Sequence, residues 1–207
     1  MATKKAAAKS PNRVSENAEE KNRPFDTRVG RAVTLTWVNE KEIDGEMRHW
    51  RSIEAHTLYK NEKDEWENGT SYGASDVISA KASVEQALFD HHGGVDRELL
   101  NPLRAAVSLP RESHQPIKIS CGAVVGLIWR NEKEDGTPWY SLTHSCRYRG
   151  EDEKGNSVMK NGKSYGRIEA HQLLAVFEEA TKQFEKLQGS PDQVVQETKD
   201  RTGKTVE

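Results

Sequence analysis

One stretch of sequence occurs twice in this chain of 207 residues, and this duplication limits the possible folds more than any other feature. Both copies contain Trp-x-Asn, then Trp-x-Ser, then Tyr before a basic residue, then Asn-Gly-x-Ser-Tyr-Gly, and finally an amphipathic run. The copies are 92 residues apart at Trp37 and Trp129, and 89 residues apart at Trp50 and Trp139. The spacing changes only between these segments, where turns are expected, so the chain is predicted to contain one structural unit twice.

Hydrophobic periodicity predicts four strands and one helix in each copy. In the second copy, strands are expected over 119–130 and 139–149, short strands after residue 156 and at Ser164, and a helix over 168–187. The first copy has the same order, with a helix that Ser75 is expected to cap. A four-stranded sheet with one helix buries one face only. We therefore expect an α+β fold in which two antiparallel sheets and two helices form one domain with approximate two-fold symmetry.

The duplicated domain is predicted to span residues 28–188. Its parts are repeat one (28–90), a linker (91–117) that includes a short helix near Leu99, and repeat two (118–188). Residues 1–27 are basic and poor in apolar side chains, and residues 189–207 are polar, so both tails are expected to be disordered. The basic tail either keeps the chain in solution or touches phosphates through non-specific charge.

Composition restricts the compartment and the chemistry. The net charge of −2 selects no partner. No apolar run approaches the roughly 20 residues that span a bilayer, so no membrane partner is expected. The N-terminal segment has basic residues but lacks the apolar stretch of a secretory signal. Cys121 and Cys146 lie in predicted strands and are expected to be reduced thiols of a cytoplasmic or nucleoid-associated protein. Without a phosphate-binding Gly-rich loop or a Ser/His/Asp pattern, we expect no enzyme, no metal and no cofactor; a homo-oligomer is left open.

The candidate binding residues come from the alternation within the second strand of each repeat. In repeat two, the residues from Tyr140 to Tyr148 at even positions are mostly apolar and are expected to face the helix. The odd positions combine an aromatic ring, hydroxyl groups and two guanidinium groups, which suits base stacking and phosphate contact. The predicted nucleic-acid-binding residues are Trp50, Ser52, His56, Lys60, Arg130, Trp139, Ser141, Arg147, Arg149 and Lys163.

Packing is the competing interpretation of these aromatic residues, because aromatic side chains favour strands in general. Trp37 and Trp129 are expected in the core, whereas packing and base stacking both stay open for Trp50 and Trp139. Repeat one carries eight Lys and Arg against twelve Asp and Glu, a net charge of −4, and repeat two carries eleven against ten, a net charge of +1. Nucleic-acid-binding domains usually have a stronger basic bias. A non-catalytic protein-interaction or assembly module that uses the same surface is therefore the alternative function.

The doubled strand-strand-strand-strand-helix unit resembles the Whirly, PUR and positive-cofactor-type single-stranded nucleic-acid-binding proteins. The resemblance covers residues 28–90 and 118–188 and is one of topology. The local pattern Gly-x-(Val/Ala)-x-x-Leu-x-Trp-x-Asn also resembles small bacterial and phage proteins of the same apparent topology. The resemblance implies binding of single-stranded DNA or RNA on exposed sheet faces, in replication, repair or transcription control.

Overall fold

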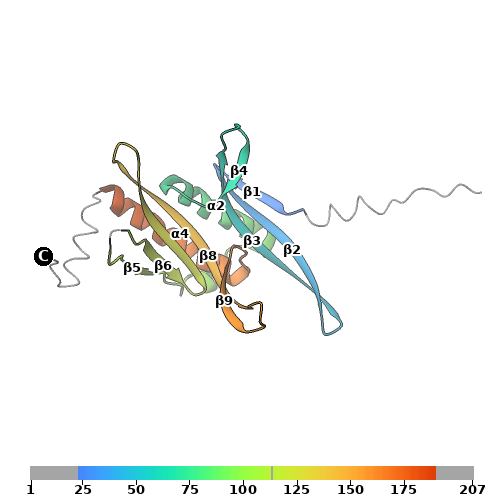
Figure 1. Cartoon of the computed structure of the whole chain (residues 1–207). Coiled ribbons are helices and arrows are strands. Elements are labelled where there is room, and N and C mark those ends of the chain that lie inside the picture. Colours follow the sequence, from blue (N-terminus) through green and yellow to red (C-terminus); the bar gives the residue numbers. More distant parts are fainter. Residues whose placement is uncertain (1–22, 113, 190–207) are drawn as a thin grey trace, which may run out of the picture.

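Two antiparallel sheets form the strand layer of the protein in a computed structural model that describes residues 23–112 and 114–189 (Figure 1). Sheet A has the order β1 (Phe25–Val29), β2 (Ala32–Ile43), β3 (Glu46–Lys60) and β4 (Trp66–Gly69). Sheet B has the order β5 (Ala106–Ser108), β6 (Ile117–Cys121), β7 (Val124–Glu132), β8 (Pro138–Glu151) and β9 (Ser157–Gly162). The prediction of an α+β chain with two antiparallel sheets is confirmed.

Two long helices form the second layer. Helix α2 (Ala74–His92) covers β1, β2 and β3, helix α4 (Arg167–Gly189) covers β6 and β7, and the two helices pack against each other (Figure 1). Their apolar faces recur at steps of three and four residues and are buried against the sheets. The fully buried helix positions include Val77, Val84, Leu173 and Phe177. The linker adds a short helix, α3 (Arg97–Leu100), where the sequence predicted one. It also adds strand β5, which contains Ala106 and Val107, two residues that were expected in that helix.

The first predicted strand of each repeat is two strands joined by a tight turn. Gly30 and Gly122 have φ angles of 58° and 57°, a left-handed conformation that favours glycine and reverses the chain. Strand β1 consequently begins at Phe25, inside the segment predicted to be disordered, and α4 continues to Gly189. The remaining tail residues, 1–22 and 190–207, lie outside the described residues, and so does the prediction of disorder for them.

The segments that precede the two long helices cross from one sheet to the other. The backbone of Tyr72, after β4, exchanges two hydrogen bonds with Leu142 of β8, at 2.9 and 2.8 Å. The backbone of Tyr165, after β9, does the same with Ile53 of β3, at 2.8 and 2.9 Å. Both tyrosines are completely buried. Each is an isolated bridge rather than the short strand that the sequence predicted, and the two bridges join sheet A to sheet B.

A buried histidine connects the two crossing segments. The ring of His144 lies 3.0 Å through Nε2 from the hydroxyl of Tyr72 and 2.5 Å through Nδ1 from that of Tyr165. Its ring also packs edge-on against Phe177 of α4. Burial lowers the pKa of His144 to about 3, with smaller contributions from the charges of His56 and Lys163. The imidazole is therefore neutral at pH 7. Leu142 and Cys146 are buried beside it, which confirms the predicted inner face in this part of the strand, whereas Tyr148, predicted on the same face, is 48% exposed.

The neutral state of His144 predicts an acid-sensitive fold. The unfolded chain takes up a proton near pH 6.5, whereas the folded protein does so only near pH 3, so stability falls as the pH drops through this window. Between pH 7 and pH 5 this group alone lowers the unfolding free energy by about 2 kcal/mol. The variant His144→Gln keeps a neutral hydrogen-bonding side chain that does not titrate. Its unfolding free energies at pH 7 and pH 5, measured by urea denaturation, should differ by about 2 kcal/mol less than those of wild type. The same pH dependence in variant and wild type would contradict the role given to His144.

Candidate nucleic-acid interface

The side of each sheet that is turned away from α2 and α4 is called its outer face. Strands β2 and β3 pair without a bulge, and so do β7 and β8, so alternation holds along their whole paired length. In β8 the inner face is marked by His144, which touches Phe177 of α4. In β2 it is marked by Thr34, whose hydroxyl accepts a hydrogen bond from Ser83 of α2. The odd positions of β8 and the even positions of β3 therefore belong to the outer faces.

Four residues form a square on the outer face of sheet B, next to the turn that joins β7 to β8. Trp129 lies opposite Ser141, and Asn131 lies opposite Trp139. Along one diagonal, Asn131 Nδ2 donates a hydrogen bond of 3.1 Å to Ser141 Oγ. Along the other diagonal stand the two indole rings, which are 38% and 44% exposed and form no stacked pair with each other within the described chain. The hydrogen bond between Asn131 and Ser141 thus links the side chains of β7 and β8, while both indole rings remain exposed to solvent.

The outer face of sheet A carries the same square. Trp37 lies opposite Ser52, Asn39 lies opposite Trp50, and Asn39 Nδ2 donates a hydrogen bond of 2.9 Å to Ser52 Oγ. Trp50 is 46% exposed. Two of the predicted binding residues, Ser52 and Ser141, are only 6% and 5% exposed, so their hydroxyl groups support the asparagines rather than face solvent. This repeated Trp/Asn/Ser/Trp arrangement is called the tryptophan square.

The expectation that Trp37 and Trp129 belong to the core is wrong. Strand alternation puts both on the outer faces, because each pairs with the serine of its square and not with an inward residue. Trp129 Nε1 donates to Thr143 Oγ1 at 3.2 Å. The position that matches Thr143 in sheet A is Glu54, which lies 3.4 Å from His56 instead. As a result Trp37 Nε1 is buried without a hydrogen-bond partner among the described residues.

The cations of sheet B remain available on its outer face. Arg147 and Arg149 lie on the same face of β8 as Trp139, both are exposed, and neither forms an ion pair within the described residues. Lys118 of β6 is exposed on this face too. The single acidic side chain that alternation assigns to the same face, among the described strands, is Glu151 at the end of β8. The local balance is therefore positive, although repeat two as a whole is nearly neutral.

The predicted cation of sheet A is neutralised. Lys60 Nζ lies 2.5 Å from the carboxylate of Asp64 and 5.5 Å from the ring centre of Trp66. His56 is half-buried against Glu54. These contacts leave Lys60 and His56 less free to meet a phosphate than Arg147 and Arg149.

Sequence reasoning missed two cations on this outer face. Lys41 and Arg48 lie directly opposite each other, two residues beyond Asn39 and Trp50, and both are exposed. They form no ion pair among the described residues. Lys41 was expected in a turn over residues 39–45 and the second strand was expected to begin at Trp50, whereas β2 continues to Ile43 and β3 begins at Glu46. The step of two residues from Arg48 to Trp50 was the signal that could have identified it.

Two other predicted residues lie away from the squares. Arg130 belongs to the opposite side of β7 from Trp129 and lies 3.9 Å from Glu132. Lys163 is exposed in the segment between β9 and Tyr165, outside the strands. Trp139, Ser141, Arg147 and Arg149 share the outer face of sheet B, where Arg147 and Arg149 lie roughly 26 and 33 Å from Trp139 along β8. Trp50, Ser52, His56 and Lys60 share the outer face of sheet A, without Arg130 and Lys163.

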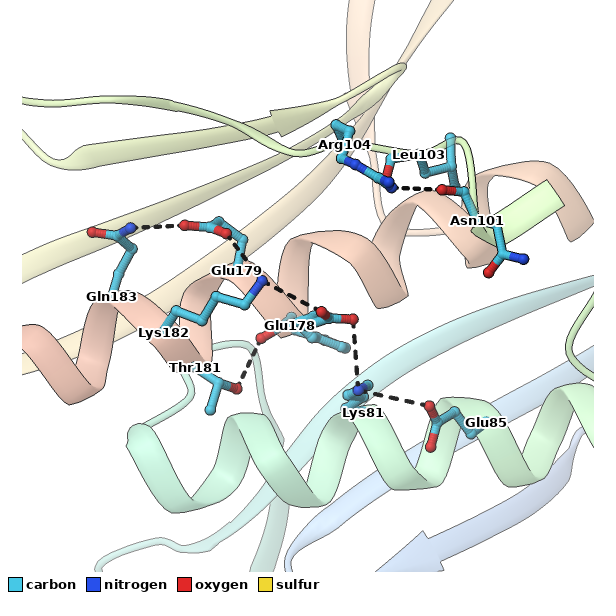
Figure 2. A network of polar contacts seen from close by, with 11 residues as sticks. Lys81, Glu85, Asn101, Leu103, Arg104, Glu178, Glu179, Thr181, Lys182 and Gln183 are labelled. Carbon is cyan, nitrogen blue, oxygen red and sulfur yellow. Dashed lines mark hydrogen bonds and ion pairs between the residues drawn. The ribbon is translucent and has the colours of Figure 1, made fainter. Parts of the chain in front are cut away.

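A hollow lies on the helix side of the molecule, away from the outer faces. It has a volume of about 470 Å³ and lies between α4 and the linker, with Leu100, Leu103 and Ala175 among its lining residues. Figure 2 shows that its charges are already engaged: Lys182 contacts both Glu178 and Glu179, at 3.4 and 3.6 Å. Arg104 donates hydrogen bonds to backbone carbonyl groups of the linker (Figure 2). This hollow provides less free charge than the outer faces.

Residues 23–112 and 114–189 contain neither a candidate metal-binding cluster nor a helix that could span a membrane. These residues contain no cluster of three or more His, Cys, Asp or Glu side chains that could hold a metal ion. None of their helices has both the length and the apolar character needed to cross a bilayer. Cys121 and Cys146 are buried free thiols, and burial raises the pKa of both.

Comparisons with protein-family models, curated proteins and solved structures found no match to this chain. The geometry of the outer faces is therefore the basis for the function proposed below.

The tryptophan square predicts a stability cost that can be measured. Replacing Asn131 by Ala removes the partner of the buried Ser141 hydroxyl, and a buried polar group left without a partner costs about 1–3 kcal/mol. Urea unfolding of Asn131→Ala should show a loss in this range. Asn161→Ala is the matched control, because Asn161 is exposed on the same face and should change stability by less than about 0.5 kcal/mol. Equal losses in the two variants would count against the square as a structural unit.

Proposed function

We propose that this protein binds single-stranded DNA or RNA through the outer face of sheet B and catalyses no reaction. The observation that carries the proposal is the combination of two open indole rings with two arginines that have no carboxylate partner among the described residues. An aromatic ring that stacks on a base contributes roughly 1–3 kcal/mol and tolerates any sequence. Guanidinium groups supply the contacts to the phosphate backbone.

The open indole rings on this surface favour an unpaired strand over a duplex. The rings of Trp129 and Trp139 rise from a sheet whose neighbouring positions are small or hydrogen-bonded, such as Ser141, Ser145 and Asn131. Bases reach a ring face only when they are unstacked from their own neighbours, as they are in single strands. A duplex would present its phosphates to Arg147 and Arg149 but no base face to the indoles.

We also propose that the two halves are copies of one unit related by an approximate two-fold axis. The exchanged bridges support this, because Tyr72 pairs with Leu142 while Tyr165 pairs with Ile53, and these are equivalent positions of the two repeats. The repeated square supports it as well. Such a unit agrees with the resemblance to Whirly, PUR and positive-cofactor-type proteins, and with a role in replication, repair or transcription control in the cytoplasm.

The test removes the two arginines and measures how binding depends on salt. Labelled single-stranded DNA is titrated with wild type and with Arg147→Ala/Arg149→Ala at several salt concentrations. Because displaced counterions drive phosphate binding, the slope of log affinity against log salt should fall by about 0.7 for each phosphate that the variant no longer neutralises. The double variant Lys63→Ala/Lys186→Ala removes the same charge from exposed positions outside both outer faces and should bind like wild type. Lys60→Ala should matter less, since Asp64 already pairs with Lys60.

The same titration includes two further measurements and one result that would refute the proposal. A matched duplex should bind more weakly than the single strand, and bases that stack on Trp139 should quench its fluorescence. If wild type shows no salt-sensitive binding at micromolar protein, the nucleic-acid function fails. The outer faces would then be assigned to the protein-interaction or assembly module.

A further inference from the structure

The outer face of sheet A carries the same tryptophan square as sheet B, with Trp50 as its exposed ring. Trp50 is as exposed as Trp139, at 46% and 44%, and each stands beside an asparagine held by a buried serine. The Asn-to-Ser hydrogen bonds are 2.9 Å in sheet A and 3.1 Å in sheet B. A ring that projects from an equally supported position can stack on a base in the same way. The low net charge of repeat one does not remove this property, because stacking does not require charge.

Sheet A also has its own cations for phosphate, although not at the position that matches Arg147 and Arg149. Lys41 and Arg48 are a cross-strand pair on the outer face, next to Asn39 and Trp50. Two cations in directly opposite positions repel each other unless an anion lies between them. Both are exposed and have no acidic partner among the described residues. A phosphate group beside a base stacked on Trp50 would relieve this repulsion.

The two squares lie on either side of the junction between the sheets. Trp50 is three residues from Ile53 and Trp139 is three residues from Leu142, or about 10 Å along each strand. Ile53 and Leu142 are the residues that accept the crossing tyrosine segments, so backbone hydrogen bonds fix the position of each square relative to the junction. Both outer faces point away from the same helix layer (Figure 1). A single strand that leaves one square can therefore continue onto the other.

We infer that sheet A carries a second binding site for unpaired nucleotides, and that one strand of sufficient length occupies both sites at once. This inference rests on the proposed function of sheet B. Once a strand is bound to sheet B, its next nucleotides reach sheet A at an effective concentration in the millimolar range, which exceeds that of a second free strand. The ligand is therefore a continuous unpaired segment, and affinity rises in a step when the segment reaches both squares.

The experiment compares short and long oligonucleotides on matched variants. Labelled single strands of about 5 and about 20 nucleotides lie near the lower end of, and above, the roughly 4–16 nucleotides that an OB fold covers on a single strand. The long strand should bind wild type at least about tenfold more tightly than the short one, with one strand per protein. Trp50→Ala should abolish this gain and leave the short strand unaffected. Trp139→Ala should weaken both strands, and circular dichroism should verify that both variants remain folded.

A second pair of variants tests the same site through charge. Lys41→Ala/Arg48→Ala should lower the salt slope by about 1.4 for the long strand, which corresponds to two phosphate groups, and leave the slope for the short strand unchanged. Lys63→Ala/Lys186→Ala, with the same change of charge elsewhere, should alter neither slope.

The outcomes separate this inference from the proposed function. If the short strand binds with salt dependence, but length brings no gain and Trp50→Ala has no effect, the second site is refuted while the function of sheet B stands. If two short strands bind each protein and the long strand gains nothing, the sites are independent and the single spanning strand is refuted. If neither length binds, the proposed function itself fails.

Discussion

The exchange of the tyrosine segments is the interaction on which the rest of the structure depends. Part of β3 in sheet A and part of β8 in sheet B have no strand of their own sheet beside them. Tyr165, from the segment after β9, pairs with β3, and Tyr72, from the segment after β4, pairs with β8. His144 lies between the two hydroxyl groups and is buried and neutral. Such a buried polar group is stable only while its partners are in place, so the two crossings depend on one another. Neither half can complete its own sheet alone.

This exchange fixes the direction of the two outer faces. Tyr72 and Tyr165 immediately precede α2 and α4, so the same residues that cross between the sheets also start both long helices on one side of them. The other side is left uncovered by the helices of the described chain (Figure 1). Exposed tryptophans on an uncovered sheet are costly for a chain that only needs to fold, because apolar rings gain by burial. Their presence in equivalent places, above equivalent Asn-to-Ser hydrogen bonds, is what makes a ligand the better explanation.

The sequence was informative where one strand face is buried and the pairing is regular. Leu142, His144 and Cys146 were predicted to face inward, and they do, because β8 has no bulge that would reverse the alternation. The turn at Gly30 was not predicted, since a two-residue reversal leaves the apolar pattern on both sides nearly continuous. The ion pair of Lys60 with Asp64 depends on a turn in which Asp64 has a φ angle of 63°, and periodicity carries no information on such a turn. The crossing of Tyr72 and Tyr165 is a tertiary contact that local patterns do not encode.

The net charge of a repeat does not give the charge of one sheet face, because successive side chains along a strand point to opposite faces. Along β2, Lys41 belongs to the outer face, while its neighbours Glu40 and Glu42 belong to the other side. The hairpin is one strand layer thick, however, so these carboxylates lie within the Debye length of about 8 Å at physiological salt and still weaken attraction to phosphate. Under the function proposed above, base stacking on Trp50 would therefore supply most of the affinity of sheet A. On sheet B, Arg147 and Arg149 lie on the same face as Trp139, so charge and stacking would both contribute there. The same square would thus serve binding through different physical contributions in the two sheets.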